Sequence, residues 1–305
     1  MATDSADIAI SIIIPTCGRL DGLRRILDLI WPQIEMCRVS CEVLVCDDSG
    51  GKDVEDLLAD CSPQTEWLPV PRRGAGACRN SGAEHANGQW LLFLDDDVLP
   101  QPGLLSAYSD AFFSAGSSEV AFEGATLLDR PVSSLLWEAP ANPNCTGHPS
   151  CNWGIRKSFF MEAMGFDERY LRSQDIEFAA RVGAMGREFR PLPQAVVIHP
   201  LRPVPTASAL AARWEYKLLY ALDLGIDPLA ARYRIPWHAF RVIQSRFRGA
   251  SWSYDNFVAM GIFAYEWALV LWRNGAWIEK WRTKQPSEFW TQTIADGYRV
   301  AKYGL

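Results

Sequence analysis

Three consecutive carboxylates, Asp95, Asp96 and Asp97, follow directly on an apolar run at residues 90–94. A short apolar run that ends in turn-forming residues is typical of a buried strand, so the acids should stand where that strand leaves a sheet. Alternate residues of an extended segment point the same way, which lets Asp95 and Asp97 converge while Asp96 faces elsewhere. Carboxylate oxygens suit Mg²⁺ or Mn²⁺, which bind through one or two carboxylates, substrate phosphates and water. The run therefore predicts a metal site, and a solvated acidic turn is the alternative.

Other apolar runs also end in polar residues. Residues 8–14 lead to Pro15 and Thr16, residues 41–46 lead to Asp47 and Asp48, and residues 195–198 lead to His199. Open sheets of parallel strands bind ligands outside the carboxyl ends of their strands. We therefore expect these side chains to lie along one edge of a sheet, together with the acidic run.

Strands and helices alternate along the first two thirds of the chain, which predicts βαβ units, a mostly parallel sheet and an α/β fold. A domain is expected over residues 1–204, and a helical extension over residues 205–305. We expect strands at residues 8–14, 41–46, 66–70, 90–94, 120–127, 151–156 and 195–198, and helices at residues 20–30, 53–61, 74–87, 101–116, 157–164 and 175–186.

Charge is unevenly distributed over the 305 residues. The net charge of −6 argues against a nucleic-acid-binding protein, yet residues 206–305 carry 13 Lys and Arg against 8 Asp and Glu, and hold eight of the 13 Trp. A basic, Trp-rich segment is a candidate for peripheral contact with an anionic membrane surface, or for homo-oligomerisation through the same aromatic surface. Residues 257–272 are apolar but too short to span a bilayer, and Glu266 interrupts them.

Eight cysteines occur without a repeated CxxC spacing, which argues against a zinc site; Cys145 and Cys151 are the pair to consider. Asp4 and Asp7 precede the first apolar run, so no secretory signal is recognised and a cytoplasmic location is expected. In that compartment the cysteines should be reduced.

Seven short motifs occur in an order that resembles the family-2 glycosyltransferases of GT-A fold. They are residues 11–16 with Arg19, and residues 45–49, 79–82, 94–97, 165–168, 174–175 and 198–199. The resemblance covers about residues 8–200. It implies a Rossmann-like sheet flanked by helices, and inverting transfer of a sugar from a nucleotide-diphosphate sugar, with UDP the commonest nucleotide, to a glycan or lipid-linked acceptor.

The resemblance also implies where the nucleotide would bind. Asp47 or Asp48 would accept a hydrogen bond from the base, and the sequence does not choose between them. Pro15 and Thr16 would bracket the base, and Arg79 would meet the base or the diphosphate, because a guanidinium fork matches phosphate oxygens. Alternatively, Arg79 would form a salt bridge on the surface of its helix. Asp95 would hold the ribose, and the nucleotide-binding set is completed by Arg19 and Asp96.

The remaining roles concern the metal and the acceptor. Asp97 would bind Mn²⁺ or Mg²⁺, with His199 as a second ligand or a mere packing residue. Asp175 would be the general base that accepts the proton of the acceptor hydroxyl; helix capping is its alternative role. Gln174 replaces the family's usual Glu, which leaves its contact with the acceptor in question. Trp153 could stack on an acceptor sugar or pack in the core.

Three rival functions are weaker. Residues 74–79 suggest a dinucleotide-binding loop, but the third glycine is missing. A nucleotidyltransferase should have a glycine-rich, basic loop after its first strand, and residues 15–19 contain one glycine. A non-catalytic nucleotide-sugar-binding scaffold, or a partner subunit of a glycan-assembly complex, is suggested by Gln174 and opposed by the presence of Asp95, Asp97, Asp175 and His199.

Overall fold

The structure is a computed structural model that describes residues 9–59, 65–70, 72–248, 250–284 and 287–295. Its described residues form two compact units, one within Met1–Arg130 and Ala139–Pro200, the other within Pro131–Glu138 and Leu201–Leu305. Asp4, Asp7 and Cys61 lie outside the described residues. The expected division into a domain at residues 1–204 and an extension at residues 205–305 stays a prediction.

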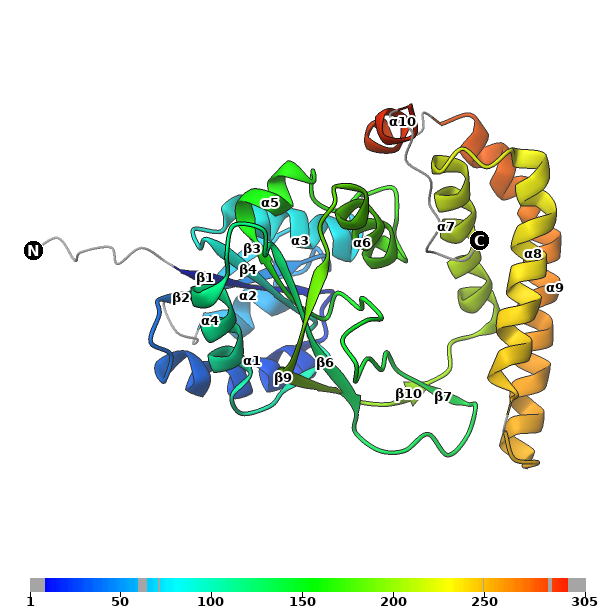
Figure 1. The fold of residues 1–305 in the computed structure, drawn as a ribbon. Helices are drawn as coiled ribbons and strands as arrows, with labels where there is room; N and C mark the ends of the chain where they lie inside the picture. Colours follow the sequence, from blue (N-terminus) through cyan, green and yellow to red (C-terminus); the bar gives the residue numbers. More distant parts are fainter. Residues whose placement is uncertain (1–8, 60–64, 71, 249, 285–286, 296–305) are drawn as a thin grey trace, which may run out of the picture. The chain divides into compact units, whose positions relative to one another are not determined.

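The first unit contains the predicted alternation of strands and helices (Figure 1). Its elements are β1 (Ile10–Thr16), α1 (Leu20–Glu35), β2 (Cys41–Asp47), α2 (Asp53–Leu58), β3 (Thr65–Pro69), α3 (Gly74–His85), β4 (Trp90–Leu94), β5 (Leu99–Pro100), α4 (Leu104–Ser114), β6 (Ala121–Leu128), β8 (Asn152–Arg156), α5 (Lys157–Glu162), α6 (Gln174–Ala184) and β9 (Phe189–His199).

One eight-stranded sheet joins these strands in the order β3-β2-β1-β4-β8-β6-β9-β5. Neighbouring strands from β3 to β4 are parallel, β8 runs antiparallel to both β4 and β6, and β9 is parallel to β6. Strands β1, β2, β3, β4, β6 and β9 therefore all point their carboxyl ends to the same edge. The predicted mostly parallel α/β sheet is confirmed.

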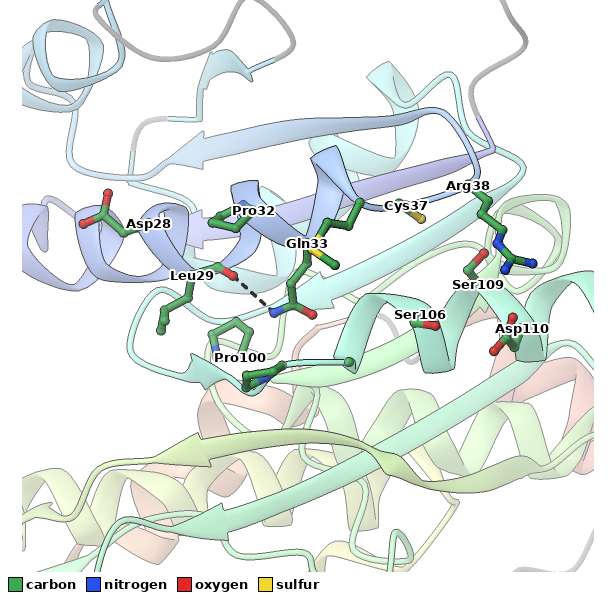
Figure 2. A pocket seen from close by; sticks show the side chains of 13 residues that line it. Asp28, Leu29, Pro32, Gln33, Cys37, Arg38, Pro100, Ser106, Ser109 and Asp110 are labelled. Atoms are coloured by element: carbon green, nitrogen blue, oxygen red, sulfur yellow. Dashed lines mark hydrogen bonds between the residues drawn. The ribbon is translucent and has the colours of Figure 1, made fainter.

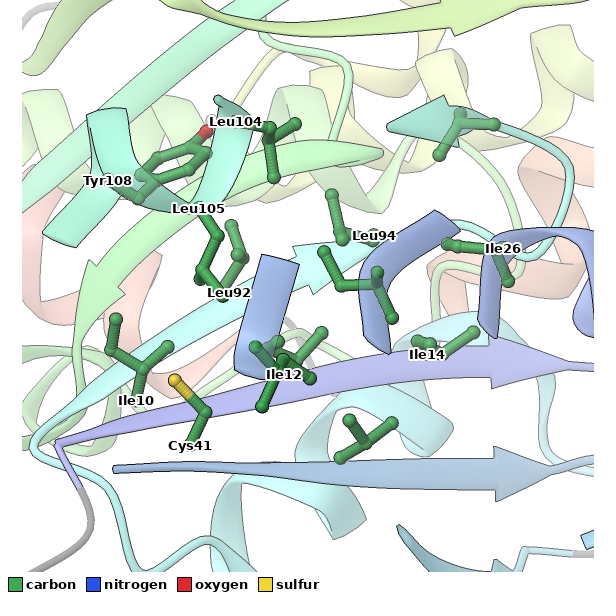
Figure 3. Packing of buried hydrophobic residues seen from close by; sticks show 14 of the residues in the cluster. Ile10, Ile12, Ile14, Ile26, Cys41, Leu92, Leu94, Leu104, Leu105 and Tyr108 are labelled. Atoms are coloured by element: carbon green, nitrogen blue, oxygen red, sulfur yellow. The ribbon is translucent and has the colours of Figure 1, made fainter. Parts of the chain in front are cut away.

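Helices cover both faces of the sheet because its apolar strands alternate their side chains between the two sides. On one face, Ile12 and Ile14 of β1 pack with Leu92 of β4 against apolar residues of α1 and α4, among them Ile26 and Leu105 (Figure 3). On the other face, Ile13 and Phe93 belong to a second cluster that includes residues of α3, α5 and α6. The sheet is thus the middle of three layers, as in doubly wound α/β folds.

Helix α3 lies unusually close to the sheet at Gly82. A Cβ atom at this position would stand 2.6 Å from a methyl carbon of Ile13 and 2.9 Å from the Cys46 sulfur, closer than packing allows. Glycine at residue 82 therefore sets how near the helix comes to β1 and β2. The same helix carries Arg79, so this close approach also fixes the depth of that side chain.

Two expected element boundaries differ most from those observed. Helix α1 does not stop before Pro32 but continues to Glu35 with the proline inside it. Proline removes one backbone donor, and this loss falls near the helix end while Ile34 beyond it remains packed in the core. Strand β9 begins at Phe189 rather than at residue 195, and its pairing with β6 is interrupted by an irregularity after Gly124.

The second unit contains the predicted helical extension. Its elements are β7 (Trp137–Glu138), β10 (Arg202–Pro203), α7 (Ala207–Asp223), α8 (Pro228–Arg246), α9 (Tyr254–Arg282) and α10 (Glu288–Ala295). The three long helices are each preceded by a residue whose side chain accepts hydrogen bonds from first-turn amides, namely Thr206, Asp227 and Ser253. None of the described helices combines the length and apolar composition that crossing a bilayer requires.

Candidate functional site

The carboxyl edge of the sheet gathers the polar residues that were predicted to meet there. Thr16 and Asp47 are directly opposite each other where β1 and β2 end, and His199 ends β9 beside Leu128 of β6. Strand β4 ends at Leu94, so the acidic run leaves the sheet at this edge. The order and direction of the strands therefore bring together side chains that are up to about 180 positions apart in sequence.

Arg79 of α3 is the most deeply buried cation at this edge, with 2% of its surface exposed. Its Nη2 pairs with Oδ1 of Asp95. Its Nε and Nη1 atoms have no hydrogen-bond partner among the described residues. Buried guanidinium donors are rarely left unpaired, because each has lost its contacts with water. The site therefore has donor capacity for a ligand with oxygen acceptors.

Asp96 and Asp97 lie in a turn after β4, so the alternation expected of an extended segment was wrong here, and Arg19 contacts both carboxylates. The buried Asp96 carboxylate accepts hydrogen bonds from the Thr16 hydroxyl (2.7 Å) and from Nε of Arg19 (3.1 Å). Burial raises the pKa of Asp96 to about 6, although the Arg19 charge and the Thr16 hydrogen bond both act to lower it. Asp96 thus joins the loop after β1 to the loop after β4.

Asp97 and His199 come together across the site. Nε2 of His199 lies 3.5 Å from Oδ1 of Asp97, and Nη1 of Arg19 lies 2.7 Å from Oδ2. The other ring nitrogen of His199, Nδ1, is 3.1 Å from the Pro200 carbonyl oxygen, which favours the tautomer with its proton on Nδ1. That tautomer leaves the Nε2 lone pair directed toward Asp97 and available to a metal ion.

These donors fit a divalent metal that takes few protein ligands. No group of three or more His, Cys, Asp or Glu side chains suited to a metal occurs in the part of the chain that the structure describes. Mg²⁺ and Mn²⁺ commonly bind through one or two protein groups, with substrate phosphates and water filling the remaining positions. One carboxylate and one imidazole nitrogen supply what such an ion needs from the protein.

The two acids after β2 are held differently. The buried Asp47 carboxylate accepts hydrogen bonds from the Ser49 amide and hydroxyl, each at 2.9 Å. The half-buried Asp48 accepts from the amides of Arg73 (2.5 Å) and Gly74 (3.0 Å), which fastens it to the start of α3. An ionised carboxylate has four acceptor positions, so both acids keep capacity for a base.

Asp175 lies in the first turn of α6, while Ser173 occupies the position that precedes the helix. Burial raises the pKa of Asp175, the nearby positive charge of Arg79 lowers it, and the negative charge of Asp95 raises it. Asp175 is therefore within electrostatic range of the Arg79–Asp95 pair. A carboxyl group with a raised pKa is better matched to proton transfer near neutral pH than an ordinary aspartate.

One predicted acceptor residue has to be corrected. Trp153 has no exposed surface. Its ring centroid lies 4.4 Å from that of Phe189 and 6.2 Å from those of Phe166 and Phe178. A ring enclosed in this way offers no face to a sugar, so Trp153 is a core residue. Gln174, at the start of α6, is also largely buried, with 9% of its surface exposed.

Asn80, which follows Arg79 on α3, contributes to the site although no role for it was predicted from the sequence. Its side chain donates to the Phe166 carbonyl oxygen (2.8 Å) and accepts from the Phe166 amide (2.7 Å). This pair of bonds fixes the turn at residues 165–168 to α3. In addition, Arg73 pairs with Glu168. The adjacency of Arg79 and Asn80 within one motif was the available signal for this contact.

A separate cavity of about 620 Å³ lies between α1 and α4 (Figure 2). Its lining includes Asp28, Gln33 and Arg38 of α1 and its end, together with Ser106 and Asp110 of α4. None of its lining residues belongs to the group at the carboxyl edge. The cavity is therefore distinct from the site described above.

Comparison with known proteins agrees with this geometry. Residues 11–114 match the model of glycosyl transferase family 2. The pre-mycofactocin glycosyltransferase of *Mycobacterium tuberculosis* is 29% identical over 206 residues, which cover 62% of this chain and 42% of that protein. The succinoglycan biosynthesis protein ExoO of *Rhizobium meliloti* is 28% identical over 163 residues, or 48% of this chain and 45% of that protein. The chain thus spans less than half of the length of these relatives.

Among solved structures, the mannosyltransferase PcManGT of *Pyrobaculum calidifontis*, in complex with GDP-mannose and Mn²⁺, superposes with a TM-score of 0.55. The superposition covers 96% of this chain and 87% of that chain at 17% sequence identity, which establishes a common fold. Together with the ordered motifs and the sheet, these similarities support a glycosyltransferase of family 2 type with the GT-A fold.

Proposed function

We propose that this protein transfers a sugar from a nucleoside diphosphate sugar to a hydroxyl group of a glycan or lipid-linked acceptor. UDP-sugars are the first donors to test because of their prevalence among similar proteins. The GDP-mannose bound to the *Pyrobaculum* mannosyltransferase makes GDP-sugars the second class. The relatives act in pre-mycofactocin glycosylation and succinoglycan biosynthesis according to their names, so glycans and glycosylated small molecules both belong in the acceptor panel.

The observation that carries the proposal is the buried Arg79 guanidinium beside Asp95. Two of its nitrogen atoms lack a hydrogen-bond partner in the described residues, and one pairs with Asp95. A diphosphate supplies several anionic oxygens that match a guanidinium fork, and a ribose supplies hydroxyls that a carboxylate accepts from. Arg79 would therefore bind the diphosphate, and Asp95 would bind the ribose on the same side of the site.

Asp175 is the proposed general base. The acceptor hydroxyl oxygen forms a bond to the anomeric carbon of the donor while the bond from that carbon to the diphosphate oxygen breaks. The hydroxyl proton passes to the Asp175 carboxylate, and the nucleoside diphosphate leaves. Attack opposite to the leaving group in one displacement inverts the anomeric configuration, so NMR of a product with retained configuration would contradict this scheme.

Asp97 and His199 are the proposed protein ligands of Mn²⁺ or Mg²⁺. When bound, the ion would act as a Lewis acid that neutralises negative charge on the departing diphosphate. Arg19 orients Asp97 through its hydrogen bond to Oδ2, and Asp96 holds the same guanidinium from the other side. Residues of the β1 and β4 loops thereby position the metal-binding carboxylate.

Release of nucleoside diphosphate from a panel of UDP- and GDP-sugars, with Mn²⁺ and acceptor sugars, tests this function. We expect release from one donor class, loss of that release with EDTA, and loss in Asp97→Asn. Asp110→Asn is the matched control, because Asp110 is an exposed carboxylate in the α1–α4 cavity. It should retain wild-type release.

A non-catalytic nucleotide-sugar-binding protein is the second candidate, since Gln174 lacks the charge of the carboxylate that is usual at this motif position. Nucleotide binding by calorimetry, without transfer and without slow hydrolysis of any donor in the panel, would favour this candidate over the enzyme. Transfer to any acceptor would exclude it.

A further inference from the structure

The outer face of α9 has an unusual composition for a solvent-facing helix. From residue 257 to residue 276 no exposed position carries a charge, over a length of about 30 Å. Surface helices normally place charged and polar side chains on the side away from the core. The exposed residues in this interval are Phe257, Met260, Gly261, Ala264, Tyr265, Ala268, Leu271, Trp272 and Ala276.

Helix α8 extends this apolar face. Leu229, Tyr233 and Trp237 follow one another at four-residue spacing and are 68%, 73% and 62% exposed. Trp237 stacks on Phe240 with ring centroids 5.7 Å apart, and Phe240 contacts Trp267 of α9 at 5.4 Å. The stripe on α8 therefore adjoins α9, and the two helices run alongside each other (Figure 1). We call this joint surface, formed by the exposed residues of both helices, the aromatic face.

Arginines flank the aromatic face. Helix α8 contains Arg232, Arg234, Arg241 and Arg246 and no Asp or Glu. Arg246 reaches inward to the buried Glu266, whereas the other three are exposed. Exposed rings of Trp and Tyr beside exposed guanidinium groups are the side chains that proteins place at the headgroup level of a bilayer.

We propose that the aromatic face docks on the surface of a membrane that contains anionic lipids. Lipid phosphates would supply the counter-charge that α8 lacks, and the rings would enter the boundary between headgroups and acyl chains. The helices would lie along the membrane surface. This proposal concerns the second unit and does not depend on which reaction the first unit performs.

A second copy of the chain fits the same face less well. A symmetric dimer joins identical patches, so the arginines of one α8 would approach a surface that is flanked by the same arginines. The described part of α8 offers no carboxylate to offset them. An anionic bilayer presents negative phosphates opposite every exposed arginine of α8. Charge complementarity therefore favours a lipid surface over a second copy.

Flotation of the full chain with vesicles tests the proposal. We expect binding to vesicles of phosphatidylcholine with phosphatidylglycerol at low salt, weaker binding at high salt, and weak binding to pure phosphatidylcholine. Arg234→Gln should lower partitioning about fivefold, and Arg241→Gln by a similar factor. The double variant Trp237→Glu/Trp272→Glu should lower it by roughly tenfold or more, because each ring is then no longer buried in the interface.

Phe113→Glu is the matched control, since Phe113 is 91% exposed but lies on α4 of the first unit. It should leave vesicle binding unchanged, and thermal melting should show that all variants fold. Absence of flotation at low salt would overturn the proposal, as would full binding by the Trp237→Glu/Trp272→Glu variant. A dimer in light scattering that Trp272→Glu dissociates, together with no flotation, would assign the face to a second copy instead. The arginine variants keep the test decisive if the double variant does not fold.

Discussion

Nε2 of His199 lies 3.5 Å from Oδ1 of Asp97, although the two residues are 102 positions apart. Strand β9 delivers the imidazole and the turn after β4 delivers the carboxylate, both at the carboxyl edge of the sheet. The contact between Nδ1 and the Pro200 carbonyl oxygen favours the tautomer with its proton on Nδ1. This proximity is what the proposed shared Mn²⁺ or Mg²⁺ ion would require of the two side chains.

Replacing His199 by Ala should weaken metal binding. Loss of one of two protein ligands is expected to raise the Mn²⁺ concentration for half-maximal activity by about tenfold or more. The rate of nucleoside diphosphate release as a function of Mn²⁺ measures this effect. An unchanged Mn²⁺ dependence would mean that His199 only packs at the end of β9.

Replacing Arg79 by Lys should impair donor binding while keeping the positive charge. Lysine lacks the planar fork, so at least one charge-assisted hydrogen bond to the diphosphate is lost, which corresponds to roughly 1.5–3 kcal/mol, or a 10- to 150-fold weaker affinity. Calorimetric titration with nucleoside diphosphate and Mn²⁺ gives the affinity directly. Arg38→Lys, an exposed arginine at the α1–α4 cavity, provides the control and should bind as the wild type does.

Asp175 should give the transfer reaction a distinct pH dependence. Burial raises its pKa above the ordinary value of an aspartate, and the base must be ionised to accept a proton. The rate of transfer should therefore fall on acidification. The fall should begin at a higher pH than it would if the base were an exposed aspartate with an ordinary pKa. Asp175→Asn should lower kcat by about 10²- to 10⁴-fold and leave donor affinity nearly unchanged. Equal losses of donor binding and transfer would instead indicate a role in binding.

The raised pKa of Asp175 also makes the stability of the fold depend on pH. A raised folded-state pKa means that the native protein binds this proton more tightly than the unfolded chain does, so the group stabilises the fold at low pH. That contribution is lost as the pH rises through the folded pKa. Asp175→Asn should consequently melt at a temperature no lower than the wild type at neutral pH. A clear drop in melting temperature there would show that the ionised carboxylate stabilises the fold.

Sequence patterns predicted the layered α/β fold and the site's edge because both follow from local features. Apolar runs identify buried strands, and the residue after each run marks where the strand ends. The start of β9 was missed since Pro191 and Pro193 argue against a strand, whereas the irregular pairing with β6 accommodates them. Trp153 was open to two interpretations because its enclosure depends on Phe166, Phe178 and Phe189, which are brought together only by the tertiary fold.

The role of Glu266 in the second unit likewise depends on tertiary contacts that the sequence does not reveal. In sequence it argued only against a membrane span, since it stands within an apolar run. In the structure it is 1% exposed, and its carboxylate accepts hydrogen bonds from Nε1 of Trp214 (2.8 Å) and Nη1 of Arg246 (3.3 Å). It therefore joins α9 to both α7 and α8, by contacts that no local pattern in the sequence predicts.

Truncating this carboxylate should destabilise the helical unit. Glu266→Ala would leave the indole N–H of Trp214 without its acceptor and the Arg246 guanidinium without its counter-charge, at a cost of about 3–5 kcal/mol. Glu266→Gln keeps an acceptor oxygen for Trp214 and should cost less. The midpoint of urea unfolding, followed by far-ultraviolet circular dichroism, measures both. Glu279→Gln on the same helix is the control, because the exposed pair with Arg282 should contribute less than about 1 kcal/mol. Equal midpoints for Glu266→Ala and Glu279→Gln would show that the buried carboxylate does not hold the three helices together.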